Sequence, residues 1–188
     1  MSASAELRAR TAEAHARVDT AFSAYDLSHR AQYAAFLLAH SRALPVAEEL
    51  IRNNVALPLS RPRTRLLEQD MRALDQAMPA RLPFGCAASA AAAWGIFYVV
   101  EGSRLGGGIL AKRVGADLPT AYLGARHEPG EWSAIRKAID AEALQHDAAW
   151  MDCAVLAAEA CFDLYERSCR SCPFTEAPPC ALQQGLNW

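Results

Sequence analysis

The feature that most constrains the fold is an apolar segment, residues 94–114, whose middle carries four glycines. Apolar residues recur at helical spacing on both sides of these glycines, so we expect one helix here. Each glycine in a helix interior costs ~1 kcal/mol relative to alanine. At about 100° per residue, Gly95, Gly102 and Gly106 fall on one narrow stripe of bare backbone. Such a stripe lets a flat ligand or a second helix approach the helix axis closely, and the glycines at 106–108 favour a bend.

The composition indicates a single domain of closely packed helices. The chain has 188 residues, of which 52% are hydrophobic, many of them alanine, and only 8% are aromatic. This length supports one substantial core, and alanine is the strongest helix former. We therefore predict an all-α domain over residues 1–168, followed by a tail at 169–188 that contains three cysteines and three prolines.

Charge and hydropathy exclude several classes of protein. The formal net charge is −2, so no basic surface is expected for nucleic acid. The first residues lack the apolar stretch of a signal peptide, and the longest apolar run, residues 86–100, is too short to span a bilayer. These features predict a cytoplasmic protein whose cysteines are thiols rather than disulfides.

Apolar periodicity predicts five further helices. Ser28 is the expected N-cap of the second of these, and Pro45 is expected to break or kink it. The segment 117–130 carries glycine and proline and is predicted to be a loop. The expected helices cover residues 4–18, 28–51, 63–78, 131–144 and 148–168.

The first predicted helix brings three polar side chains to one side. Arg8 precedes His15 by two turns, and Asp19 follows it by one turn, where its carboxylate can accept a proton from one ring nitrogen. A lone histidine on a helix is more often structural or exposed, but these neighbours favour a metal ligand. An imidazole, a cation and a bare helix together suit a planar macrocycle that carries carboxylates, namely heme. The other four histidines, His29, His40, His127 and His146, are predicted to be structural or exposed.

The glycine stripe has a second interpretation. Small residues spaced four apart also occur where two helices pack closely, and spacing by itself favours this alternative. A phosphate-binding loop fits poorly, because no Gly-Lys-Ser/Thr sequence follows and no strand precedes.

Two segments resemble the heme oxygenase family. Residues 7–15, followed by Asp19, are similar to the proximal helix, in which a histidine binds the heme iron. Residues 98–107 resemble the distal helix, especially that of the bacterial biliverdin-producing branch. The resemblance implies an all-α, heme-oxygenase-like fold with heme between these two helices.

The resemblance also implies roles for individual residues. His15 would be the axial iron ligand, Asp19 the partner of its other nitrogen, and Arg8 a contact to a heme propionate. Gly102, Gly106 and Gly107 would line the distal face. Ser103 replaces an aspartate that organises distal water, so Ser103 or the Gly102 carbonyl would orient that water. Phe162 and Glu166 stand where basic propionate contacts are found in relatives.

The implied activity is cleavage of heme, by O2 and electrons, to biliverdin, carbon monoxide and ferrous iron, with heme as both cofactor and substrate. No flavin or nicotinamide motif is present, so electrons would come from a ferredoxin, a flavodoxin or a reductase. A bacterial phytochrome is one conceivable user of the biliverdin. The alternatives are a heme carrier or sensor without turnover, and a helical thiaminase-like enzyme. A zinc site that includes Cys169, Cys172 and Cys180 is a lesser alternative, because no fourth ligand is evident.

Overall fold

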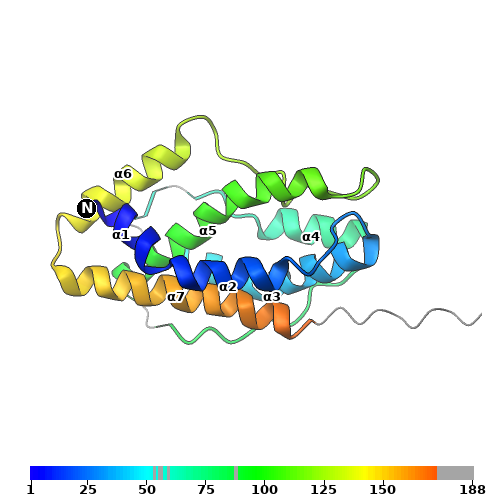
Figure 1. Cartoon of the computed structure of the whole chain (residues 1–188), viewed down its shortest axis with the longest axis horizontal. Helices are drawn as coiled ribbons and strands as arrows, with labels where there is room; N and C mark the ends of the chain where they lie inside the picture. The colour runs from blue at the N-terminus through cyan, green and yellow to red at the C-terminus, as the bar shows by residue number, and fades with distance from the viewer. Residues whose placement is uncertain (53, 55–56, 59, 87–88, 173–188) are drawn as a thin grey trace, which may run out of the picture.

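The computed structural model describes residues 1–52, 54, 57–58, 60–86 and 89–172, which form seven α-helices, one short 3-10 helix and no strand. This confirms the predicted all-α class. The helices, shown in Figure 1, are α1 (Ala3–Arg10), α2 (Ala12–Phe22), α3 (Arg30–Arg52), α4 (Thr64–Ala73), α5 (Ala90–Leu110), η1 (Ala111–Arg113), α6 (Glu131–Ala143) and α7 (Ala148–Arg170).

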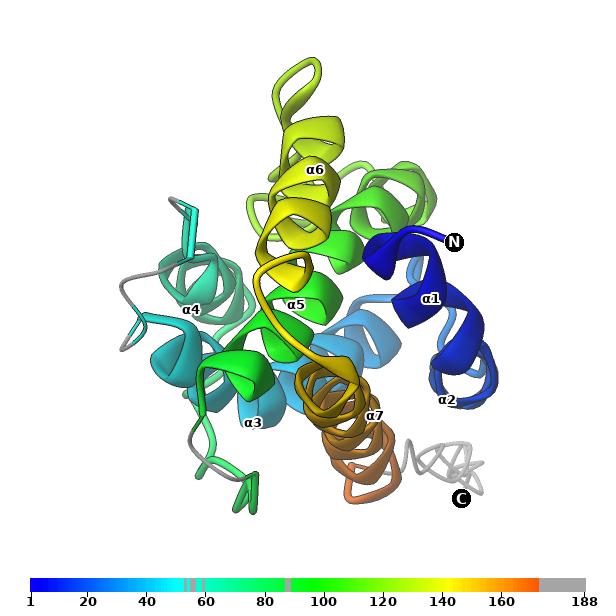
Figure 2. The same cartoon turned by 90° about the vertical axis from the view of Figure 1, so that its left-hand side faces the viewer.

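The glycine-bearing helix α5 lies at the centre of the bundle. It packs against α7 and α3, while α2 packs on α7, α4 on α3, and α6 on α1. Figure 2 looks along the bundle and shows α5 surrounded by the other helices. In Figure 1, α5 changes direction between its two halves, as the glycines in its sequence favour.

The α5–α7 contact depends on one glycine of the stripe. A Cβ placed on Gly95 would lie 2.0 Å from the carbonyl oxygen of Ala154, so only glycine permits this approach. Ala154 and Ala158 on α7 are both fully buried. Small residues at this contact therefore allow the backbones of the two helices to pack directly against each other.

The first predicted helix is divided into α1 and α2 at Thr11. The backbone of Thr11 has φ −98° and ψ 4°, and its hydroxyl donates to the carbonyl of Leu7 at 2.7 Å. This back-bonding competes with the helical ladder and bends helices. The division leaves Arg8 on α1 and His15 on α2.

The other helix boundaries differ from the predictions by a few residues. The helix α3 begins at Arg30 rather than after Ser28, because the Ser28 hydroxyl donates to Asp26 at 2.7 Å instead of capping a helix. It also continues through Pro45, which is buried against the core. The helix α4 ends at Ala73, five residues before the predicted end, where Asp75 takes a left-handed conformation with φ 59°.

The helix α7 ends at Arg170, two residues beyond the predicted boundary of the tail. Cys169 and Cys172 are buried there, and the Tyr25 hydroxyl donates to the carbonyl of Cys172 at 2.9 Å. Cys180 and the rest of 173–188 lie outside the described residues. Within the described part of the chain, no three His, Cys, Asp or Glu side chains are grouped as a metal site would require. No helix there is long and apolar enough to cross a membrane.

Candidate functional site

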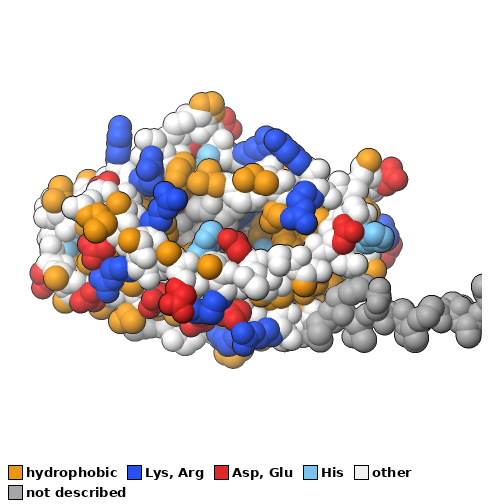
Figure 3. Space-filling model, in the orientation of Figure 1, with side chains coloured by type: hydrophobic (Ala, Val, Ile, Leu, Met, Phe, Trp, Pro, Cys, Tyr) orange, Lys and Arg blue, Asp and Glu red, His pale blue; other side chains and the backbone are white. Residues whose placement is uncertain are grey.

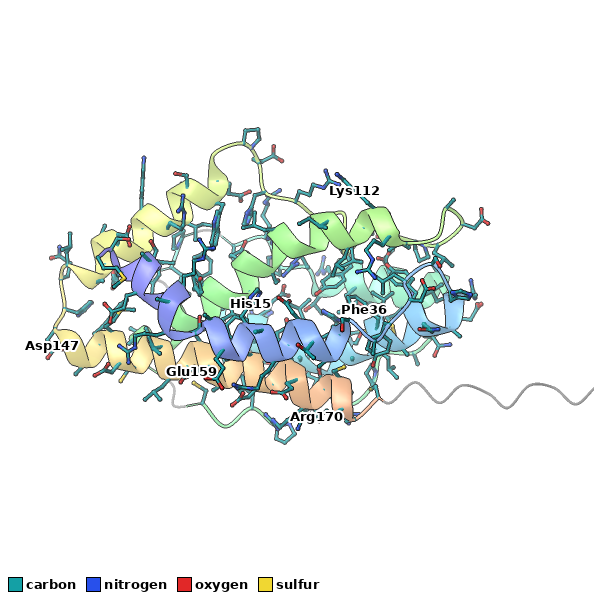
Figure 4. All side chains as sticks on the ribbon, viewed as in Figure 1. His15, Phe36, Lys112, Asp147, Glu159 and Arg170 are labelled. Carbon is teal, nitrogen blue, oxygen red and sulfur yellow. The ribbon has the colours of Figure 1, made fainter. Side chains whose placement is uncertain are left out.

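The surface is hollowed between α2 and α5 (Figure 3). Figure 4 places His15 at the edge of α2 that faces α5, and Phe36 of α3 near the C-terminal end of α2. Phe36 contacts Phe22, the last residue of α2, with ring centroids 5.4 Å apart. The hollow therefore has α2 on one side, α5 on the other and apolar side chains of other helices between them.

His15 is held from two sides and remains open on a third. Its Nδ1 atom lies 3.6 Å from Oδ2 of Asp19, and its side chain is 59% exposed. Its ring meets Phe162 of α7 edge-on, with centroids 5.4 Å apart. The spacing of four residues thus turns Nδ1 toward Asp19, at a distance that a small side-chain rotation converts into a hydrogen bond. Nε2 has no hydrogen-bond partner among the described residues and is available to a ligand.

The C-terminal half of α5 carries an unobstructed glycine and two exposed aliphatic side chains. A Cβ on Gly106 would meet no atom within 4 Å, unlike one on Gly95. Nearby on α5, Leu105 is 48% exposed and Ile109 is 67% exposed, and these two side chains share a face because they stand four residues apart. Large aliphatic side chains exposed together on one helix face indicate a surface that a ligand or partner covers.

The glycine stripe therefore serves two purposes in different parts of α5. Gly95 packs against α7, as the alternative interpretation predicts, whereas Gly106 faces open space. Gly102 lies between these cases, since a Cβ there would stand 3.5 Å from Trp132 of α6. Gly107 is buried, and a Cβ on it would lie 3.4 Å from the carbonyl oxygen of Leu123, so it faces the 117–130 loop rather than the open face.

Ser103 is engaged by a buried arginine that the sequence did not reveal. Its hydroxyl donates to the carbonyl of Val100 at 2.7 Å and accepts from Arg63 at 2.6 Å. Arg63 is 1% exposed, and its guanidinium lies over the ring of Tyr122, 5.2 Å from the centroid. The Glu48 carboxylate fixes this segment by accepting from the backbone N–H groups of Arg63 and Thr64.

His40 lies in a cluster of aromatic rings that also includes Tyr122. The rings of Phe22, Phe36, Tyr122 and Tyr165 stand 4.2–5.6 Å from its own, centroid to centroid. Its Nδ1 donates to the carbonyl of Phe36 at 3.0 Å. Desolvation by these rings lowers the pKa of His40 to about 4, so the imidazole is neutral near pH 7 and Nε2 is a hydrogen-bond acceptor.

Two polar atoms beside His40 lack partners. The Tyr165 hydroxyl and Nε of Arg63 are buried with no hydrogen-bond partner in the described part of the chain. Buried polar atoms without protein partners are commonly satisfied by ordered water. In the sequence, only the placement of His40 four residues after Phe36 hints at this cluster, since its other members come from distant segments.

Arg8 is an exposed cation without an ion-pair partner in the described residues, unlike its neighbour Arg10, which pairs with Asp152 at 2.8 Å. On α7, Glu166 is already neutralised, because its carboxylate accepts from Arg17 at 3.2 Å and from Arg170 at 2.5 Å. Arg8 is thus free to bind an anion, and the two arginines beside Glu166 are not.

No protein-family model matches the chain. The chain is, however, 31% identical over 158 residues to a heme oxygenase of Xanthomonas campestris pv. campestris (strain 8004). This similarity covers 78% of the chain and 92% of the relative. The chain belongs to the heme oxygenase family.

A solved structure agrees with this assignment at the level of fold. The structure is similar to that of the NO- and CO-bound heme oxygenase from Neisseria meningitidis, with a TM-score of 0.76 and 22% sequence identity. The match covers 95% of this chain and all of that one. The heme oxygenase fold predicted from the sequence is therefore confirmed.

Proposed function

We propose that this member of the heme oxygenase family binds heme between α2 and α5 and cleaves it, with O2 and external electrons, to biliverdin, carbon monoxide and ferrous iron. One observation supports the proposal: α2, which bears the exposed His15, and α5, which bears the unobstructed Gly106, border the same hollow from opposite sides. The family relationship supplies the chemistry, and the two facing helices supply a place for it.

The residues around the hollow fit this substrate. His15 offers Nε2 to the iron, while Leu105 and Ile109 offer apolar surface to the macrocycle. Arg8 offers an unpaired cation to a propionate. When bound, heme supplies both the iron at which O2 reacts and the ring carbon that is oxidised.

The protein's own part is to position groups and to keep others away. Asp19 holds the imidazole in one tautomer, which makes it a better ligand. Gly106 leaves room above the bound macrocycle for O2 and water, with no side chain there to donate a proton at the wrong place. We expect the Gly102 carbonyl and the Ser103–Arg63 pair to orient that water.

The cluster around His40 is suited to ordering water. The neutral His40 offers Nε2 as a hydrogen-bond acceptor, and the Tyr165 hydroxyl and Nε of Arg63 require water partners. We infer that a chain of ordered water links these groups to the open face of α5. Arg63, His40 and Tyr165 would then act on the reaction through water rather than by direct contact.

The electrons must come from another protein, and a ferredoxin, a flavodoxin or a reductase would serve. The biliverdin would pass to a further protein, of which a bacterial phytochrome is one example. A cytoplasmic location suits such partners, and the helices described here contain no membrane span.

The test compares wild type with His15→Ala and with His29→Ala as the control, since His29 is exposed and paired with Asp26 elsewhere on the surface. Each protein is titrated anaerobically with heme, then given reductant and air. Wild type and His29→Ala should lose the Soret band and release biliverdin. His15→Ala should keep some heme affinity, lose normal turnover and regain part of it with added imidazole.

Three results would contradict the proposal or part of it. A stable oxygen complex of wild type with no biliverdin would indicate a carrier or sensor. Failure of wild type to bind heme would favour a different helical enzyme, such as one of the thiaminase-like class. Turnover by His15→Ala at the wild-type rate would show that His15 is not the iron ligand.

A further inference from the structure

Heme carries two propionates, and the two α7 positions where relatives have basic contacts, Phe162 and Glu166, offer neither of them a free cation. Phe162 packs against His15, and Glu166 is neutralised by Arg17 and Arg170. Arg8 by itself leaves one propionate without a partner. A second cation must therefore come from another helix if the heme is to be held in one orientation.

The helix α6 approaches the end of the hollow through Trp132. The Trp132 ring lies 5.9 Å from the ring of Tyr98 on α5, and a Cβ on Gly102 would lie 3.5 Å from it. Arg136 follows Trp132 by one helical turn, so it projects from the same side of α6. This places Arg136 on the side of α6 that meets Tyr98 through Trp132.

The helix α1 is fastened to α6 in a way that brings Arg8 to the same point. The backbone N–H of Ser4 donates to Oδ1 of Asp140 at 2.7 Å. Arg8 lies one turn after Ser4 on α1, and Arg136 lies one turn before Asp140 on α6. Figure 3 shows Lys and Arg side chains gathered where these two helices meet, beside the hollow.

The charges at this point are not neutralised by the protein. Burial raises the pKa of the Tyr98 hydroxyl, and the nearby charges of Arg8 and Arg136 oppose that rise, which places both guanidinium groups within electrostatic reach of it. Neither arginine has an ion pair in the described part of the chain. Two cations that converge on one hydroxyl form a suitable site for carboxylates.

We propose that Arg136 of α6, together with Arg8 and the Tyr98 hydroxyl, binds the heme propionates and thereby fixes the rotation of the macrocycle below Gly106. The inference rests on the proposed function and assigns α6 to the substrate site. The ring carbon beneath Gly106, and hence the biliverdin isomer released, is then determined by these two arginines.

The test uses Arg136→Gln with Lys137→Gln as its matched control, because both residues are exposed on α6 and lose the same charge, but Lys137 projects about 100° away. Dissociation constants are measured by spectroscopic titration for ferric heme and for its dimethyl ester, which lacks propionate charge. Arg136→Gln should weaken heme binding roughly 5–20-fold, as expected for a charge-assisted hydrogen bond at a partly exposed site. It should leave ester binding unchanged, and Lys137→Gln should match wild type with both ligands.

The products provide a second measurement. Chromatography of the biliverdin isomers should show a changed isomer ratio for Arg136→Gln and a wild-type ratio for Lys137→Gln. Equal weakening of heme and ester by Arg136→Gln would overturn the inference, as would heme affinity and isomer ratio that match wild type. These results leave the proposed function intact, whereas failure of wild type to bind heme overturns both.

Discussion

Gly95 of α5 and Ala154 of α7 are in backbone contact, so that a Cβ on Gly95 would stand 2.0 Å from the Ala154 carbonyl oxygen. About three turns farther along α5, a Cβ on Gly106 would meet nothing within 4 Å. Two glycines on one helical stripe therefore have opposite environments, and substitutions at them should have opposite effects on stability.

Gly95→Ala should destabilise the fold, because the new methyl group would meet the backbone carbonyl oxygen of Ala154, which cannot move aside. We expect a loss of at least about 1–3 kcal/mol in the free energy of unfolding, the range typical of overpacked cores. Gly106→Ala should instead gain up to ~1 kcal/mol from helix propensity. Urea denaturation of the two heme-free variants measures both values, and equal losses would show that Gly106 also packs against protein.

Gly106→Leu should separate binding from turnover. The new side chain would occupy the space above the bound macrocycle, so heme should still reach His15 while biliverdin formation falls steeply. Gly106→Ala should give an intermediate loss, because a methyl group fills less of that space. Single-turnover absorption spectra measure the conversion of heme to biliverdin. Conversion by Gly106→Leu at the wild-type rate would show that Gly106 does not line the heme site.

Asp19→Ala should be milder than the loss of His15. The ring nitrogen near Asp19 would lose its acceptor, and such losses commonly reduce metal affinity or activity about 10–100-fold. Resonance Raman spectra of the ferrous heme complex should show a lower iron–histidine stretching frequency. Glu13→Gln, one turn before Arg17 on the solvent side of the same helix, is the control for lost negative charge. A stretching frequency that does not change in Asp19→Ala would exclude the hydrogen bond.

His40 should make the heme-free protein sensitive to acid. Its pKa falls from 6.5 to about 4 on folding, so between these values the unfolded chain binds more protons than the folded one. Its contribution is present above pH 6.5 and is lost as the pH falls toward 4. At 1.36 kcal/mol per pKa unit, the loss approaches about 3 kcal/mol. His40→Gln should abolish this part of the pH dependence, and parallel stability curves for the two proteins would contradict it.

The helices and the approach of Asp19 to His15 were predictable because they depend on neighbours within one or two turns. A spacing of four residues brings these two side chains to one side of a helix. Thr11 shows the limit of such local reasoning, since its hydroxyl competes with the ladder and divides the predicted helix. The order of the helices and the loop at 117–130 nevertheless followed from periodicity and from glycine and proline.

The surroundings of Ser103 and His40 were decided by long-range packing. Arg63 meets Ser103 across 40 residues, and Tyr165 of α7 meets His40 of α3 across more than a hundred. No local pattern encodes such contacts, because they depend on which helix faces are buried against one another. Arg136 is likewise brought toward Arg8 by a contact between Ser4 and Asp140.

The glycine stripe shows the division most clearly. The sequence by itself determined that Gly95, Gly102 and Gly106 share one face of a helix, because helical phase is a local property of the backbone. Whether that face meets protein or open space is not local. Only the tertiary structure, in which α7 covers the first part of α5 and leaves the later part bare, decided that Gly95 packs and Gly106 remains open.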